Sequence, residues 1–300
     1  MLFPTWHHIL SPSDLKDHWH DRTPTVYCAC LRGRKVPRLC GTDDMGILYI
    51  GYCVHRKRTF REFVRCSTNG TKGHKAALTL HYFRKVSRGV DDLFGGGPTG
   101  PHLEFYYIDG DEGLLLSSVV EYIRAFGELP PVSGVVDPLK APGLKTSSKA
   151  EWTYFKDPSE LPTGKHPAVY RVHLERSYLS RWLGKDTESI IEVGQGVNPR
   201  ERLDDFVKSA TTGKRGHSEG QKVFIYSRIS PAFKALLGNG IPGCFRYSIR
   251  YVDEKDLLPE ENVSTDEYTS PYGELPPMQE NITGGRKWLE ELLRKSIGRQ

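Results

Sequence analysis

The chain contains two tandem copies of one unit, and this internal repeat limits the folds it can adopt. The segment "REFVRCSTNGTKGH" at 61–74 aligns without a gap with "DDFVKSATTGKRGH" at 204–217, an offset of 143 residues. "AFGELPP" at 125–131 returns as "PYGELPP" at 271–277, an offset of 146. Glycine followed by two prolines ends a helix, because glycine accepts the left-handed cap conformation and proline lacks an N–H group. The repeat therefore predicts one small domain built twice, with the same helix stop in each copy.

Each copy has a pattern typical of strand, strand, helix, strand and helix. In the first copy "TVYCACL", "ILYIGYC" and "LEFYYI" are rich in β-branched and aromatic residues, whereas "EGLLLSSVVEYIRAFG" has apolar residues at helical spacing. The second copy repeats this order, with a final helix that we expect to be broken at Pro259. We predict an α/β (α+β) fold in which each copy forms a three-stranded antiparallel sheet flanked by helices. The predicted organisation is an N-terminal helical segment at 1–22, a first domain at 23–135, a linker rich in proline and glycine at 136–165, a second domain at 166–282 and an amphipathic helix at 283–300.

Bulk properties indicate a protein of two domains that works inside the cell. A length of 300 residues suits two domains of ordinary size. No stretch approaches the roughly 20 consecutive apolar residues of a membrane span, and the N-terminus lacks the pattern of a signal peptide. The six cysteines form no C-x-x-C pair, which favours apolar packing in a reducing compartment over a zinc site. We therefore expect a cytoplasmic or nuclear location.

Positive charge is concentrated in short runs. The formal net charge is +5, and "HRKRTFREFVR" at 55–65 carries five basic residues among eleven. Such clusters favour a polyanionic partner, although a solvated helix face is an alternative that the sequence leaves open. We predict binding to nucleic acid, with DNA favoured, through Arg56, Lys57, Arg58, Arg61, Lys214 and Arg215.

Short motifs in each copy stand in the order found in a known enzyme family. The first copy has "TVY", "YIG", His74, Glu121 and "GELPP", and the second has "AVY", "EVG", Arg202, His217, Glu267 and "GELPP". This arrangement resembles the GIY-YIG nuclease family over 23–135 and 166–282. The resemblance implies an endonuclease that hydrolyses phosphodiester bonds with Mg²⁺ or Mn²⁺. In that family a tyrosine takes a proton from water, a glutamate holds the metal and an arginine supplies positive charge to the phosphate.

Both copies depart from the family pattern. In the first copy Thr59 stands at the arginine position, next to Arg58, and in the second Glu192 replaces the tyrosine that corresponds to Tyr49. A carboxylate at Glu192 would repel the phosphate unless it also binds metal, so the first copy is favoured as the active one. The resemblance assigns catalytic roles to Tyr27, Tyr49, Arg58, His74 and Glu121 in the first copy and to Tyr170, Arg202, His217 and Glu267 in the second, with Glu121 and Glu267 as metal ligands.

Each of these residues, taken singly, also has an ordinary structural explanation. The tyrosines are also ordinary strand residues, histidine after glycine at a loop end is a capping residue, and a glutamate on a helix usually faces solvent. Recurrence in both copies favours the functional explanation. A non-catalytic nucleic-acid-binding protein that kept the nuclease fold stays open as the alternative, because neither copy has the full motif set.

Overall fold

The computed structural model describes residues 6–15, 22–94, 102–133, 151–238 and 240–279, together with Glu291 and Arg294. Within this part the chain is a mixed α/β protein with eight α-helices and antiparallel sheets. The expected helix at 283–300 falls outside the described residues except for Glu291 and Arg294, which are both helical.

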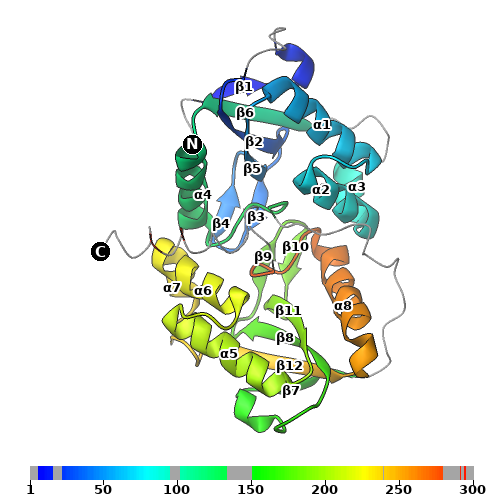
Figure 1. Ribbon diagram of the computed structural model, residues 1–300, viewed down its shortest axis with the longest axis vertical. Coiled ribbons are helices and arrows are strands. Elements are labelled where there is room, and N and C mark those ends of the chain that lie inside the picture. The colour runs from blue at the N-terminus through cyan, green and yellow to red at the C-terminus, as the bar shows by residue number, and fades with distance from the viewer. Residues whose placement is uncertain are drawn as a thin grey trace.

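The two halves have the same strands and α-helices in the same order, and the second half has one additional 3-10 turn, η3 (Figure 1). The first half consists of β1 (His7–Ile9), η1 (Pro12–Asp14), β2 (Thr25–Leu31), β3 (Val36–Arg38), β4 (Gly41–Asp43), β5 (Ile47–Cys53), α1 (Arg56–Asn69), α2 (Lys75–Val86), α3 (Arg88–Leu93), β6 (Leu103–Asp109) and α4 (Glu112–Phe126). The second half consists of β7 (Thr153–Phe155), η2 (Pro158–Glu160), β8 (Ala168–Leu174), β9 (Leu179–Arg181), β10 (Gly184–Asp186), β11 (Ile190–Gly196), α5 (Pro199–Thr212), α6 (Ser218–Ile229), α7 (Pro231–Leu236), β12 (Phe245–Tyr251), η3 (Glu254–Asp256) and α8 (Leu257–Tyr272).

Each half is built on a sheet of four strands, so the prediction of three strands per sheet is wrong. The strand orders are β1-β6-β2-β5 and β7-β12-β8-β11, and every pair is antiparallel. The additional strands, β1 and β7, are only three residues long and pair at one edge of the sheet. Strands this short give little hydrophobic pattern, which explains why the sequence did not indicate them.

The repeat unit begins earlier than the motif alignment indicated. Trp6 to Leu15 and Trp152 to Leu161 have the same structure at an offset of 146: a short strand followed by one 3-10 turn. Both turns have a capping box, formed by Ser11 with Asp14 and by Asp157 with Glu160. The predictions of a helix at 1–22 and of a linker over all of 136–165 are therefore wrong for the described residues. The capping residues that indicated a longer helix cap a single turn.

The repeated glycines stop the helices that the sequence indicated. Gly127 ends α4 and Gly273 ends α8, both with φ of +74° and with an amide that donates to the carbonyl four residues earlier at 2.8 Å. Helix α8 is not broken at Pro259, because this proline lies in the first turn, where no intrahelical donor is required. The predicted break is wrong for that reason.

The glutamate of each "GELPP" segment lies where the halves meet. Glu128 pairs with Arg38 of its own half at 3.0 Å and with Arg181 of the other half at 2.7 Å. Glu274 pairs with Arg181 at 3.1 Å and with Arg38. All four side chains are 0% exposed. We call these residues the charge quartet.

Backbone groups complete the bonding of the charge quartet. Glu128 accepts a hydrogen bond from the amide of Leu39 and Glu274 accepts one from the amide of Trp182, at 2.6 and 2.7 Å. A buried ion pair stabilises little by itself, but it requires one geometry because a misplaced charge stays desolvated. The quartet therefore fixes how the two halves dock.

Each half also packs its last helix against the other half (Figure 1). Helix α4 lies against α6 and α7, and Ser230 donates a hydrogen bond to the carbonyl of Arg124 at 3.0 Å. Helix α8 lies against α2, and the Tyr82 hydroxyl donates to Asp266. The apolar core is continuous across the contact of α4 with α6 and α7. The halves thus form one packed body, with a sheet face of each covered by its own helices α1–α2 or α5–α6.

Candidate functional site

Equivalent tyrosines occupy an inner strand of each sheet. Tyr27 on β2 pairs with Gly51, and Tyr170 on β8 pairs with Gly194. A Cβ atom on Gly194 would lie 2.5 Å from the ring carbon Cζ of Tyr170, so only glycine leaves room for the ring. Both tyrosines are 1% exposed. The recurrent tyrosine and glycine are therefore needed to pack the strand pair, whatever else they do.

The predicted histidine meets the tyrosine in both halves. The Tyr27 hydroxyl lies 2.5 Å from Nε2 of His74, and the Tyr170 hydroxyl lies 3.0 Å from Nε2 of His217. His74 and His217 precede α2 and α6 as N-cap residues. Only His74 caps with its side chain, since its Nδ1 atom accepts a hydrogen bond from the amide of Ala77 at 3.4 Å.

Aromatic and imidazole rings lie around the tyrosine of the first half. Tyr49, Phe60 and His74 lie around the Tyr27 ring at centroid distances of 5.9, 5.0 and 6.3 Å. Burial lowers the pKa of His74 to about 4, so its imidazole is neutral near pH 7. Burial also raises the pKa of Tyr27 well above its ordinary value. At this position the first half has an aromatic cluster with little charge.

The first half does not bring its predicted metal ligand to the tyrosine. Glu121 is on α4, whose buried residues pack with Val26 and Cys28, whereas Tyr27 packs in the cluster on the other face of β2. The Glu121 side chain is 46% exposed and pairs with Arg124 on the next turn. Arg58 is exposed on α1. The first half therefore joins Tyr27, Tyr49 and His74 but not Glu121.

The second half places ionisable side chains at the equivalent position. The Tyr170 hydroxyl lies 3.3 Å from Oε1 of Glu192, and Nε2 of His217 lies 3.4 Å from the same oxygen. On its other side, Nδ1 of His217 lies 3.2 Å from Oε2 of Glu219. Ligand atoms of Glu192, His217 and Glu219 all lie within 4.8 Å of one another, so these three residues could hold a metal ion.

Two cations adjoin this cluster. The Lys222 ammonium group lies 3.7 Å from Oε1 of Glu219 and donates to the carbonyl of Met278 at 2.7 Å. The guanidinium of Arg202 donates to the carbonyl of Gly216 at 3.4 Å. The positive charge of Arg202 lowers the pKa of Tyr170, although burial and the charge of Glu192 keep that pKa well above its ordinary value. Arg202 therefore lies near Tyr170, as the resemblance implies.

The two carboxyl groups of the cluster have opposite pKa shifts. Burial raises the pKa of Glu192 to about 7, and the charge of His217 offsets only part of this effect. Burial also raises the pKa of Glu219, but the hydrogen bond from His217 and the charge of Lys222 outweigh it and hold this pKa well below the ordinary value. Near pH 7 Glu219 is therefore ionised, whereas Glu192 is partly protonated and partly ionised.

The predicted metal ligand of the second half is engaged elsewhere. Glu267 accepts a hydrogen bond from Arg171 at 3.0 Å and lies 3.9 Å from Arg250. Both guanidinium groups stack on Trp152, at 4.0 and 4.5 Å from its ring centre. Glu267 thus belongs to a charge network beneath α8 and not to the Tyr170 cluster.

Sequence reasoning did not single out Glu219, Lys222 and Glu261. Glu261 on α8 accepts a hydrogen bond from Gln195 at 3.0 Å, and burial raises its pKa to about 7. The charges of Glu219 and Arg202 act on this carboxyl, so it lies beside the cluster. These three residues could have been found in the sequence as charged residues at positions where the first copy has uncharged ones. The first copy has Ala76, Thr79 and Leu115 at the positions of Glu219, Lys222 and Glu261.

The predicted basic residues lie on two surfaces. Arg56, Lys57, Arg58 and Arg61 begin α1, and Arg56 pairs with Asp109 at 3.1 Å. Lys214 and Arg215 are exposed in the loop that leads into His217. The second of these surfaces adjoins the ionisable cluster.

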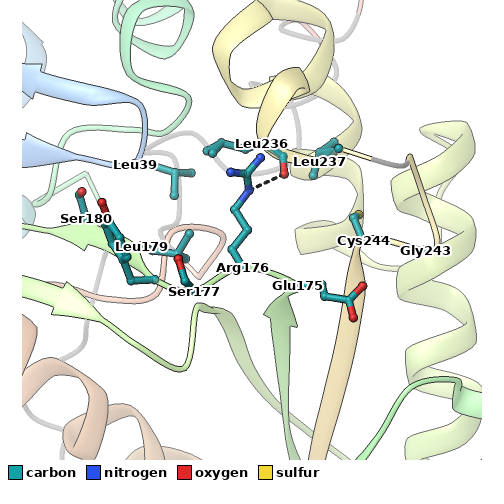
Figure 2. Close-up of a pocket in the computed structure, with 12 residues that line it drawn as sticks. Leu39, Glu175, Arg176, Ser177, Leu179, Ser180, Leu236, Leu237, Gly243 and Cys244 are labelled. Carbon is teal, nitrogen blue, oxygen red and sulfur yellow. Dashed lines mark hydrogen bonds between the residues drawn. The ribbon is translucent and has the colours of Figure 1, made fainter.

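A cavity of about 520 Å³ lies at the junction of the halves (Figure 2). Leu39 of the first half, Leu179 on β9 and Leu236 on α7 line it, and the guanidinium of Arg176 crosses it to donate to the carbonyl of Leu236 at 2.9 Å. None of the predicted site residues lines this cavity.

Comparisons with known proteins identify no relative. No family model, no curated protein and no solved structure matches the chain significantly. Among the described residues, no helix combines the length and the apolar character needed to cross a membrane.

Proposed function

We propose that the chain is a metal-dependent endonuclease that hydrolyses phosphodiester bonds in DNA, with a GIY-YIG-like site in its second half. One observation carries the proposal: the cluster of Tyr170, Glu192, His217 and Glu219 replaces the neutral aromatic cluster of the first half. Burying charge costs several kcal/mol per group unless partners compensate it. Charges gathered in a buried site with shifted pKa values are characteristic of catalytic sites.

The choice of the second half reverses the preference drawn from the sequence. That preference treated Glu192 as a fixed negative charge facing the phosphate. With a pKa of about 7, Glu192 can instead receive a proton, and its Oε1 atom lies 3.3 Å from the Tyr170 hydroxyl. A base that titrates near the working pH is suited to proton transfer. Glu192 is therefore not a fixed negative charge facing the phosphate, which removes the argument against the second half.

The remaining residues have roles that follow from their positions. Glu219 holds His217 in one orientation, and Arg202 supplies positive charge beside Tyr170. Bound metal would neutralise charge that develops on the phosphate, and Glu192 and His217 are placed to hold it. The first half then serves as a framework whose buried charge quartet holds the second half in place.

The surrounding charge supports nucleic acid as the substrate. Lys214 and Arg215 are exposed within three residues of His217, and a second group of basic residues begins α1. Phosphate contacts of this kind provide affinity without sequence preference.

A specific observation favours a second candidate, a non-catalytic nucleic-acid-binding protein. Tyr170 and His217 are each 1% exposed, so a phosphate reaches them only if the surrounding residues move. If they do not move, the cluster is a buried remnant and the basic loops alone bind the partner.

The two candidates differ in cleavage and not in binding. The purified full chain would be incubated with supercoiled plasmid and with branched DNA in Mn²⁺, in Mg²⁺ or in EDTA, while binding is measured by fluorescence anisotropy. We expect metal-dependent nicking that falls at least about 100-fold in Tyr170→Phe and Glu192→Gln. The matched variants Tyr27→Phe and Glu267→Gln should retain activity within about threefold.

Two results would contradict the nuclease proposal. Binding with no cleavage under any metal condition would leave the binding protein as the function. Cleavage that survives Tyr170→Phe but is lost in Tyr27→Phe would return the chemistry to the first half.

A further inference from the structure

Three polar atoms in the second half form a triangle with the dimensions of a metal-binding face. The Tyr170 hydroxyl lies 3.0 Å from Nε2 of His217 and 3.3 Å from Oε1 of Glu192, and the last two atoms are 3.4 Å apart. Ligands bound to one ion at 2.0–2.2 Å are roughly 2.9–3.6 Å from one another in tetrahedral or octahedral geometry. All three sides fall within this interval, so the three atoms have the mutual spacing of ligands on one ion.

The carboxylate of Glu219 lies against the nitrogen of His217 that faces away from the triangle. The carboxylate of Glu219 only accepts hydrogen bonds, and its Oε2 atom faces Nδ1 of His217. In a neutral imidazole, a proton on Nδ1 would face this carboxylate and would leave the electron pair of Nε2 in the triangle. This contact is the carboxylate–histidine arrangement that orients metal-bound imidazoles in proteins.

The triangle lacks the protons needed to satisfy its own atoms. When Glu192 is ionised and His217 is neutral with its proton on Nδ1, the Tyr170 proton is the single hydrogen available to Nε2 and the Glu192 carboxylate together. The second oxygen of Glu192, Oε2, is also buried and has no hydrogen-bond partner among the described residues. Unsatisfied buried acceptors are rare, because each costs about 1–3 kcal/mol. A cation at the triangle would engage the electron pairs of Nε2 and Oε1, which a single proton cannot both satisfy.

We infer that Glu192, His217 and Tyr170 form a site for one divalent transition metal, Mn²⁺ or Zn²⁺, with Glu219 as an outer partner that holds His217. The nitrogen ligand favours these ions over Mg²⁺, which prefers oxygen ligands and retains several waters. Glu267, at the family's metal position, takes no part, since Arg171 and Arg250 engage it. The inference rests on the proposed function for its relevance to cleavage, whereas metal binding can be measured independently.

The first half provides an internal comparison. Its histidine, His74, accepts the amide hydrogen bond of Ala77 at Nδ1, so its proton is on Nε2 and faces Tyr27. Tyr49 replaces Glu192, and Ala76 replaces Glu219. The equivalent triangle thus has neither the imidazole electron pair nor a carboxylate. One metal per chain is expected, not two.

Titration calorimetry on the full chain tests the site directly. Protein stripped with a chelator would be titrated with MnCl₂, ZnCl₂ or MgCl₂ alone, and Mn²⁺ would also be followed by electron paramagnetic resonance. We expect one Mn²⁺ or Zn²⁺ per chain, with Mg²⁺ at least about tenfold weaker. Glu192→Gln should weaken binding by about 100-fold or more, and Glu219→Gln by about 10- to 100-fold. The matched variant Glu267→Gln should bind within twofold of the wild type, and thermal unfolding would verify that each variant is folded.

Several outcomes would overturn the inference. The first is that neither Mn²⁺ nor Zn²⁺ binds below millimolar concentration. The second is that Glu267→Gln and Glu192→Gln lose the same amount of metal affinity. The third is that each chain binds two metal ions. Metal binding that depends on Glu192 without any cleavage would remove the proposed function and keep the site. Metal-dependent cleavage that persists in Glu192→Gln would remove the site and keep the function.

Discussion

Replacing Glu192 by glutamine should make the metal-free protein more stable at alkaline pH. Burial raises the pKa of this carboxyl from its ordinary value of 4.5 to about 7. The folded state therefore holds the proton more tightly than the unfolded state. The stability contributed by the group is complete below about pH 4.5 and is lost as the pH rises through 7. A pKa change of this size corresponds to roughly 3 kcal/mol at pH 8.

Glutamine imitates the protonated carboxyl and cannot ionise, so the variant avoids this loss. Urea unfolding of both proteins at pH 5, 6, 7 and 8 in a chelating buffer gives the difference in free energy of unfolding at each pH. Other titrating groups are common to both proteins and cancel in that difference. We expect an advantage of under about 1 kcal/mol for Glu192→Gln at pH 5 that grows to about 3 kcal/mol at pH 8.

Glu219→Gln is the matched control, and its effect should have the opposite sign. The pKa of Glu219 is held well below its ordinary value, so its carboxylate contributes stability that is present at neutral pH and is lost in acid. This variant should be less stable than the wild type at pH 7, with a smaller deficit as the pH falls below about 4. A pH-independent effect of Glu192→Gln, or a loss of stability at pH 8, would refute the reasoning.

Three further predictions test the framework and the partner. Glu128→Gln leaves buried arginine charge unmatched and should reduce the free energy of unfolding, measured in urea, by about 3–5 kcal/mol. The control Glu121→Gln, at an exposed side chain, should change it by less than about 0.5 kcal/mol. A loss below about 1 kcal/mol for Glu128→Gln would contradict the role of the charge quartet. Gly194→Ala places a methyl group against the facing tyrosine ring and should cost about 1–3 kcal/mol in the same assay, and Gly184→Ala, where nothing lies within 4 Å, is the control that should be almost unaffected. If nucleic acid binds near the second site, Lys214→Gln should lower the slope of log affinity against log salt by about 1 in an anisotropy titration, and an unchanged slope would place the partner elsewhere.

Recurrence between the repeats identified framework residues better than it identified chemistry. Residues that recur, such as Tyr27, Gly51 and Glu128, pack a strand pair or join the halves. The charged cluster lies where the repeats differ. Glu192 stands in place of Tyr49, and Glu219 and Lys222 stand in place of Ala76 and Thr79. Two copies of one fold share their packing requirements, but only one copy needs to keep a costly set of buried charges.

The sequence by itself determined the duplication, the order of the longer strands and of α1, α4, α5 and α8, and the helix stops after α4 and α8. These features depend on local conformational preference and on patterns that a short segment carries alone. Only the tertiary structure decided that Glu128 and Glu274 join the halves, that Glu267 faces Arg171, and that β1 forms a fourth strand. Whether a carboxylate is a metal ligand, an ion-pair partner or a solvated surface group depends on which distant residues surround it. Burial and partner distance set its charge and its pKa, and a linear pattern contains neither.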